Sequence, residues 1–546
     1  MIGPTKFRHS LSPAKLAWVA GLSLASLIVS PTPSAAQQSA DSAPATINLP
    51  ELGDVVSQDL SPAAERRLGD RIMRSVWPDP AIIDDPLVLE YIEKLWVNLL
   101  QSARARGDIS TDLDGVYAWT PFLVQDRSVN AFALPGGYIG VHLGLIAMTT
   151  TPDELASVLA HELAHVTQRH IARNISVQAR QSWVSLASII LGVLAASRDP
   201  QAAQAVIMGG QAAGIQGQLN FSRDMEREAD RVGFGILKEG GFEPAGMAQM
   251  FEHLLDASRL NDDGSYPYLR THPLTTERIG EARARLGPQG WQSHNLKARP
   301  QDSLFASHAL MSARARVRMD TRSVMLDHLT QPTVSGKGAL QTVAAHYTAA
   351  LALQHLGQLG PAAQQLQLAL RASETLNESQ RSAVLRTLSL SQIELNWLAR
   401  QPETAHANWT KLFGTSSLEK LARPELMLYS RMVLLSGYPD RTMALQSSAS
   451  ALQTHLSEHP VDSNAWSVLG EVWLALDQPI RAVRADAEAS AAKGDLPGAI
   501  DRVIGAQKRF SRPSSEDVIE LSVMDARLRT WQRQHKEDMR EDAMNR

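Results

Sequence analysis

The chain has 546 residues, of which 44% are hydrophobic and 20% are charged, and this is the composition of a globular protein. A single core rarely grows beyond about 250–300 residues, so we expect at least two domains. The net charge of −4 gives no global attraction for nucleic acid or anionic lipid, and the absence of cysteine excludes disulfides and a lipid-attachment thiol.

Residues 1–36 have the pattern of a cleaved secretory signal peptide. Three basic residues and no acidic ones accompany an apolar run at 16–29, and small residues follow at 34–36. The apolar run is shorter than the roughly 20 residues of a membrane-spanning helix, so we expect cleavage and no stable membrane insertion afterwards. In a bacterium this pattern predicts the periplasm. Residues 37–60 are rich in Ser, Ala, Pro and Asp and are expected to form a linker.

Residues 61–290 combine long helical patterns with one short region of strands. Apolar residues at three- and four-residue spacing predict helices in "AAERRLGDRIMRSV" and "DPLVLEYIEKLWVNLLQSARA". Farther along, alternation in "VYAWTPFLVQDRSVNAFALPGGYIGVHLGLI" and the turn Pro135-Gly136-Gly137 predict two or three strands of a small sheet. This segment is therefore predicted to be a mostly helical α+β domain.

The stretch "VLAHELAHVTQRH" carries His161, Glu162 and His165 at the spacing His-Glu-x-x-His. On a helix, residues four apart lie about 40° apart around the axis, so both imidazoles can bind one metal ion. Zinc lowers the pKa of a bound water to about 7, and Glu162 is placed to take its proton. The alternative is an ordinary helix that happens to carry histidines. Ala160 and Ala164 would let other elements approach this helix closely.

A catalytic zinc ion has three protein ligands and an open fourth position, so a third ligand is needed. The best downstream candidate segment is "SRDMEREADRVGFGIL". Glu226 and Asp230 are four residues apart on this predicted helix. We predict that Glu226 is the third ligand and that Asp230 accepts a hydrogen bond from a ligand histidine. Glu228, on another face, is the competing ligand, and a solvated charge cluster is the alternative without a metal.

Residues 336–510 are rich in Ala, Leu and Gln and are predicted to form pairs of helices in a tetratricopeptide-repeat solenoid. The clearest repeat has large and small residues at the spacing of that motif: Trp466, Leu469, Gly470, Trp473, Ala482 and Ala489. "AHYTAALALQHLGQLGPAAQQLQLAL" fits the same frame, two pairs near 381–413 and 424–455 fit less well, and a generic helical bundle is the alternative. Repeats of this kind bind other polypeptides.

Two further segments complete the C-terminal half: a helical connector at 291–335 and a charged helix at 511–546. Because the repeats begin after residue 335, we expect the two halves to have separate cores. A chain that ends there would then keep a folded N-terminal domain.

Four motifs in order resemble the zinc metallopeptidase family typified by the CAAX prenyl proteases and the bacterial heat-shock membrane protease. They are "NAFALPGGYIGVHLGLI", "ELASVLAHELAHVTQRH", "EREADRVG" and "THPLTTERI", and the repeats that follow are typical of the family's periplasmic branch. The resemblance implies a zincin-type fold and one zinc ion per chain. It assigns the zinc to His161, His165 and Glu226 and the general base to Glu162.

The resemblance also implies features around the metal. A substrate peptide is expected to lie extended along an edge strand that includes Asn130, Ala131, Phe132 and Ala133. His272 is expected near the metal, where it either caps the open position or stabilises the transition state; otherwise it is a plain loop residue. Arg278 either holds substrate or closes an ion pair. The apolar segments 183–197 and 206–220 are expected to form a helix and hinge over the cleft, or else a core helix.

The leading hypothesis is a zinc endopeptidase whose repeats select or deliver misfolded or stalled outer-membrane proteins. The alternative is a chaperone or assembly factor that binds such clients and the outer-membrane β-barrel assembly machinery through its repeats, with proteolysis secondary. Glu162 favours the first hypothesis, because a pure binding protein has no use for a carboxylate at that position.

Overall fold

The computed structural model describes most of the chain after the N-terminal leader. The described residues are 60–174, 222–260, 266–293, 303–336, 338–414, 417–510 and 514–544. The predicted signal peptide, the predicted linker up to residue 59, and the two apolar segments expected to cover the cleft lie outside them. Within the described ranges, no helix is both long and apolar enough to cross a membrane.

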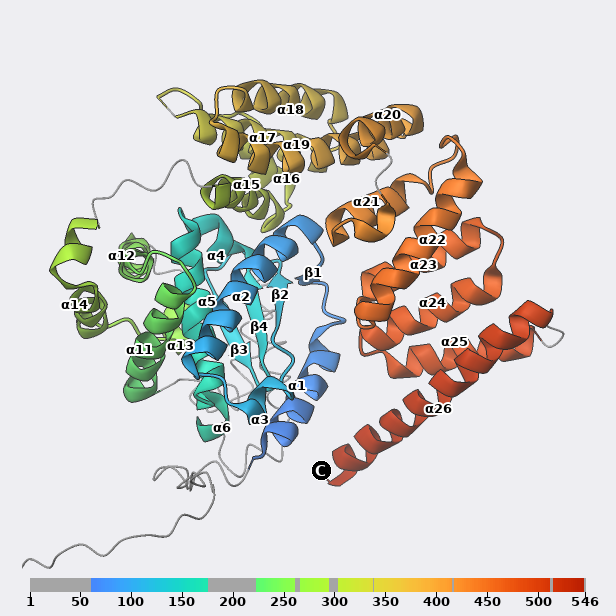
Figure 1. Ribbon diagram of the computed structural model, residues 1–546, viewed down its shortest axis with the longest axis horizontal. Helices are drawn as coiled ribbons and strands as arrows, with labels where there is room; N and C mark the ends of the chain where they lie inside the picture. Colours follow the sequence, from blue (N-terminus) through green and yellow to red (C-terminus); the bar gives the residue numbers. More distant parts are fainter. Residues whose placement is uncertain are drawn as a thin grey trace, which may run out of the picture. The chain divides into compact units, whose positions relative to one another are not determined.

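The first half of the chain folds as helices around a small four-stranded sheet (Figure 1). Its helices are α1 (Pro62–Val76), α2 (Pro86–Arg106), α3 (Thr111–Asp114), α4 (Leu143–Met148), α5 (Pro152–Thr167), α6 (His170–Asn174), α11 (Arg223–Glu239), α12 (Ala245–Leu260), α13 (Tyr268–Thr271) and α14 (Thr276–Ser293). Its strands are β1 (Ile82–Ile83), β2 (Thr120–Val124), β3 (Ala131–Leu134) and β4 (Tyr138–His142). The prediction of a mostly helical α+β domain is confirmed.

The strands follow the order β1-β2-β4-β3, so β3 stands at an edge of the sheet. β2 runs parallel to β4, with Thr120 opposite Tyr138, and β3 pairs antiparallel to β4, with Ala131 opposite Val141. The sequence predicted two or three strands and missed β1. A strand of two residues is too short to show an alternating pattern.

The predicted turn at Pro135-Gly136-Gly137 joins β3 to β4. Gly136 and Gly137 have φ angles of 76° and 84°, which L side chains rarely adopt. Helix α1 packs directly on this turn, since a Cβ atom on Gly69 would lie 1.9 Å from the carbonyl oxygen of Pro135. The glycines therefore fix both the hairpin and the helix that covers it.

Helix α5 lies at the centre of this half. Thr151 caps its N-terminus by accepting a hydrogen bond from the backbone N–H of Glu154, and Pro152 occupies its first turn. The helix contacts α2, α11, α12 and β3, and nearly all its residues are buried. Polar side chains in such a helix must find partners, because burying them unpaired costs about 1–3 kcal/mol or more each.

The second half of the chain is entirely helical in its described part. Its elements are α15 (Ser303–Arg318), α16 (Ser323–Leu329), α17 (Ala339–His355), α18 (Leu359–Ser373), α19 (Glu378–Leu398), α20 (Pro402–Phe413), the 3₁₀ turn η2 (Leu418–Lys420), α21 (Arg423–Met432), α22 (Arg441–Glu458), α23 (Ser463–Ala475), α24 (Pro479–Ala492), α25 (Leu496–Arg509) and α26 (Ser515–Met544). Consecutive helices pair closely, as α17 with α18 and α23 with α24.

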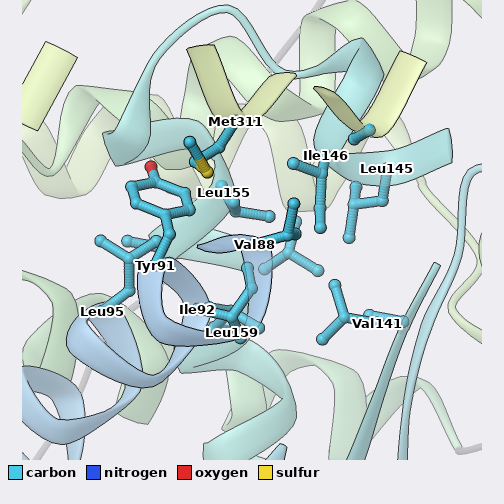
Figure 2. Close-up of a cluster of buried hydrophobic side chains, with 14 of the residues drawn as sticks. Val88, Tyr91, Ile92, Leu95, Val141, Leu145, Ile146, Leu155, Leu159 and Met311 are labelled. Atoms are coloured by element: carbon cyan, nitrogen blue, oxygen red, sulfur yellow. The ribbon is translucent and has the colours of Figure 1, made fainter. Parts of the chain in front are cut away.

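One hydrophobic core extends across both halves. Figure 2 shows side chains from α2, β4, α4, α5 and α15 converging, among them Tyr91, Leu159 and Met311. The same cluster continues through Tyr347 of α17 and Leu388 of α19. The expectation of separate cores is therefore wrong. The physical reason is that α15, in the predicted connector, packs against α2, α4 and α5 and also against α17 and α19.

A buried ion pair reinforces this junction. Arg314 Nε donates to both carboxylate oxygens of Asp85, at 2.8 and 2.7 Å, and its Nη1 donates to the Tyr347 hydroxyl at 3.2 Å. Burial by itself would raise the pKa of Asp85, but the charge of Arg314 holds it below its ordinary value. Asp85 also caps α2 by accepting from the N–H of Val88. Elements α2, α15 and α17 are thus held together at one point.

We expect a chain that ends at residue 335 to be much less stable than one that ends at residue 414. The shorter chain loses several fully buried apolar side chains, each contributing about 1.5–3 kcal/mol, together with the Tyr347 partner of Arg314. A loss of that size should lower the melting temperature by at least about 10 °C. Thermal unfolding followed by circular dichroism measures the difference. Equal melting temperatures would show that the halves do not share a core.

Candidate metal centre

Four side chains from three places in the sequence converge at the centre of the first half. They are His161 and His165 of α5, Glu226 of α11 and His272, which follows α13. One donor atom from each lies within 4.8 Å of all the others, and each residue is at most 2% exposed. His161 Nε2 is 3.0 Å from His165 Nε2 and 3.5 Å from Glu226 Oε2.

The chemistry of this donor set fits a metal ion. Two imidazole lone pairs repel each other at 3.0 Å, so a proton or a cation must lie between His161 Nε2 and His165 Nε2. Burial alone would lower the pKa of His161, but the carboxylates of Asp230 and Glu226 raise it to about 9. Glu226 is held in its charged form, since the neighbouring histidines depress its pKa against the effect of burial. The site therefore attracts positive charge to nitrogen and oxygen donors.

The close approach of α5 and α11 produces this convergence. A Cβ atom on Gly233 of α11 would lie 3.0 Å from the carbonyl oxygen of Ala160, so only glycine fits there without a shift. Ala160 and Ala164 are fully buried, as expected for small residues that let a neighbour approach. Glu226 and Asp230, one turn apart, both point from α11 toward the histidines of α5.

Asp230 and Arg278 contact the donor residues His161 and Glu226. The Asp230 Oδ1 atom lies 3.0 Å from His161 Nδ1, on the side of the ring away from the other donors. Arg278 donates two hydrogen bonds to Asp230, at 2.7 and 2.8 Å, and its Nη1 lies 2.8 Å from Glu226 Oε2. Arg278 is only 4% exposed. The ion pair is one of the two roles expected for Arg278.

Glu162 lies beside the donor set without joining it. The side chain is fully buried, and its Oε1 atom is 3.5 Å from His272 Nε2. Burial raises the pKa of Glu162, while the charges of His272 and His161 act in the opposite direction. A raised pKa brings a carboxylate closer to the range in which it can both accept and return a proton near neutrality.

The expected substrate strand lies next to Glu162. Ala131, Phe132 and Ala133 belong to edge strand β3, and Asn130 directly precedes it. β3 packs against α5, and the backbone N–H of Ala133 lies near enough to Glu162 to stabilise its charged form. Phe132 and Ala133 are partly exposed, whereas Asn130 and Ala131 are buried.

The competing ligand, Glu228, lies apart from the four donors. Its carboxylate oxygen is 3.0 Å from His170 Nε2 and 3.1 Å from Arg173 Nη1. His170 ends the stretch VLAHELAHVTQRH, and its spacing predicts no role for it. Tyr268 was also not expected at the site, and its ring stacks on His272 at a centroid distance of 4.6 Å. No local pattern marks Tyr268.

The amino-acid sequence is similar to those of known proteins. Residues 103–286 match the family described as Peptidase family M48. A Vibrio cholerae relative is 41% identical over 239 residues, which are 44% of this chain and 47% of the relative. The beta-barrel assembly-enhancing protease of Escherichia coli (strain K12) is 29% identical over 470 residues, 84% of this chain and 87% of that protein. The chain therefore spans about half of the first relative and most of the second.

A third relative is named as a metalloendopeptidase. The mitochondrial metalloendopeptidase OMA1 of Saccharomyces cerevisiae is 28% identical over 225 residues, 39% of this chain and 61% of that protein. The family match, residues 103–286, includes the four buried donors and Glu162. Residues 103–286 therefore have the sequence of a peptidase family M48 domain, and most of the chain is similar to a beta-barrel assembly-enhancing protease.

Proposed function

We propose that the protein is a zinc-dependent endopeptidase of the periplasm that degrades misfolded or stalled outer-membrane proteins and assists their assembly. The observation that carries the proposal is the buried set of His161, His165 and Glu226 with Glu162 beside it. Two imidazoles and one carboxylate are the ligands of many catalytic zinc sites. The leader-like pattern of residues 1–36 supports export, and the related assembly-enhancing proteases support the substrate class.

Each residue of the site has a separate task in this proposal. His161, His165 and Glu226 hold the zinc ion, and Asp230, fixed by Arg278, orients the ring of His161. When bound, zinc polarises the peptide carbonyl and acidifies the attacking water. Glu162 takes the proton of that water and returns it to the amine that leaves. The roles of these residues explain why a carboxylate is buried at position 162.

Substrate recognition is assigned to two places. A peptide in extended conformation adds to the edge of β3, where backbone N–H and C=O groups of Ala131–Ala133 provide hydrogen bonds beside Glu162. The helical pairs from α17 to α25 are proposed to be tetratricopeptide repeats. A Cβ atom on Gly470 would lie 3.5 Å from the carbonyl oxygen of Ala482, so α24 packs closely on α23 at this small residue.

A cavity among the last helices supports a binding role for the repeats. It has a volume of about 350 Å³ and lies between α22, α23, α24 and α26. Trp466 and Trp473 provide apolar walls, and Arg481 and Arg484 provide positive charge next to Glu520. Such a lining suits segments of unfolded clients that combine apolar and acidic groups. The outer-membrane β-barrel assembly machinery is the second proposed partner of this region.

His272 is proposed to act as a latch. Its Nδ1 atom is 3.0 Å from Glu226 Oε1 and 3.3 Å from His161 Nε2, so the imidazole supplies a fourth donor. An imidazole in this position fills the space beside Glu162 where the attacking water must stand. Movement of the segment that carries His272 would then be needed before hydrolysis.

Replacing Glu162 by Gln should abolish peptide hydrolysis and leave zinc bound, because the general base is lost and the ligands are kept. Casein digestion and metal analysis of the two purified proteins test this. Residual cleavage above about one per cent of the wild-type rate would contradict the mechanism, since removal of a general base typically costs about 10²–10⁴-fold.

The same variant separates proteolysis from the alternative function of a chaperone or assembly factor. Cells that carry only Glu162→Gln should accumulate stalled outer-membrane proteins. Normal assembly and turnover in those cells would favour client binding without cleavage as the main activity.

Glu226→Ala should lose zinc and activity together, whereas Glu228→Ala should reach full zinc occupancy when zinc is in excess. The reason is that Glu226 lies among the donors and Glu228 contacts His170 instead. Atomic absorption after dialysis against buffered zinc measures the occupancy. Full occupancy in Glu226→Ala and none in Glu228→Ala would transfer the third ligand to Glu228.

His272→Ala should hydrolyse peptides faster than the wild type, because the latch is removed while His161, His165, Glu226 and Glu162 remain. Initial rates on an unfolded substrate at saturating zinc give the comparison. A slower variant would mean that His272 stabilises the transition state. Unchanged rate and zinc affinity would show that His272 has neither role.

A further inference from the structure

His170 is buried in contact with the metal centre although the proposed function gives it no task. The side chain is 0% exposed. Its Nδ1 atom lies 2.9 Å from Nδ1 of His165, and its Nε2 atom lies 3.0 Å from a carboxylate oxygen of Glu228. Glu228 in turn accepts a hydrogen bond from Arg173 at 3.1 Å. A continuous line of contacts therefore runs from His165 to the protein surface.

The backbone is shaped to bring His170 to this position. On a continuous helix, residues five apart lie about 140° apart around the axis, so His170 would point away from His165. The helix instead stops at Thr167, and Arg169 adopts a left-handed conformation with a φ angle of 54°. Helix α6 then begins at His170 and turns the imidazole back toward α5.

A left-handed conformation at a residue other than glycine is unfavourable, and contacts of the same side chain offset this cost. The guanidinium of Arg169 donates to the backbone carbonyl of Leu60 and lies 3.3 Å from the buried carboxylate of Glu65. The break in the helix is thus anchored on α1. The backbone at Arg169 thus contributes to the placement of His170 beside α5.

The direction of the hydrogen bonds follows from the ligand role of His165. A ligand imidazole uses the lone pair of one nitrogen for the metal and carries its proton on the other. Because His165 Nε2 faces the donor set, His165 Nδ1 carries the proton and donates it to His170 Nδ1. His170 then carries its own proton on Nε2 and donates it to Glu228. In this orientation each of the three groups has a partner in the line.

We propose that His170 is a positioning residue of the metal centre, which acts with Glu228 to fix the ring and the tautomer of His165. This proposal rests on the proposed zinc site. It gives the two ligand histidines parallel supports: Asp230 contacts His161 directly, whereas Glu228 reaches His165 through one intervening imidazole. Arg278 and Arg173 pair with the two carboxylates. The proposal also explains why Glu228 faces this site without being a ligand.

The test is the affinity of the purified full-length protein for zinc, measured by competition with a chelator. His170→Phe keeps an aromatic ring of similar size but accepts no hydrogen bond, and it should weaken zinc binding by about 10- to 100-fold. His170→Gln should restore most of the affinity, because its amide can accept from His165 and donate to Glu228. Glu228→Leu, at a partly exposed position, should weaken binding in the same direction as His170→Phe.

Two further measurements separate positioning from general packing. The visible absorption spectrum of the cobalt(II)-substituted protein should change in His170→Phe, because it reports ligand geometry. His308→Phe is the matched control, since His308 is also a buried histidine with two hydrogen bonds, to Tyr91 and Thr149, away from the metal centre. It should lower the melting temperature without changing zinc affinity or the cobalt spectrum.

The outcomes distinguish this inference from the proposed function. Wild-type zinc affinity in His170→Phe and Glu228→Leu would overturn the positioning role and leave the zinc peptidase intact. If His170→Phe fails to fold, Glu228→Leu and His170→Gln decide the question. A wild-type protein that binds no zinc would instead overturn the proposed function itself.

Discussion

The close packing of α11 on α5 is the constraint on which the rest of the structure depends. α5 is buried on all sides, yet three of its buried side chains are the polar residues His161, Glu162 and His165. Burying such groups without partners costs several kcal/mol, so a second element must bring complementary charge to within hydrogen-bonding distance. Gly233 permits this approach by removing the Cβ atom that would meet the backbone of Ala160. The carboxylates of α11 then pair with the histidines.

Two chains of polar contacts lead away from the donor set, one through Asp230 to Arg278 and the other through His170 and Glu228 to Arg173. Each of the two α5 histidines is held at its Nδ1 side, one by Asp230 and the other by His170. Burial by itself would raise the pKa of Asp230 and of Glu228. Hydrogen bonds from Arg278 lower the pKa of Asp230, and hydrogen bonds from His170 and Arg173 lower that of Glu228. Rigid supports of this kind let donors keep one geometry, which metal binding and catalysis both require.

The helical second half is joined to the first by more than a linker. α15 contributes to the same core as α2 and α5, and Arg314 is buried against Asp85. Farther along, Arg386 bridges Glu90 of α2 and Glu425 of α21, with contacts of 2.6 and 2.5 Å. Removing one partner of the buried pair Arg314–Asp85 would leave an uncompensated charge and cost about 3–5 kcal/mol. The helices of the second half therefore help to stabilise the half that carries the metal centre.

The sequence by itself determined the local features: the helix with two histidines four residues apart, the second helix with its acidic residues, the glycine turn after β3 and the pairs of helices in the C-terminal half. These follow from spacing and residue type, which act within a few turns of the chain. Only the tertiary structure put Glu226 among the buried donors and Glu228 beside His170, placed Arg278 in an ion pair, and brought His170 to His165. Those outcomes depend on which face of α11 meets α5 and on the left-handed turn before α6. The shared core was hidden for the same reason, since contacts between residues hundreds of positions apart leave no local pattern.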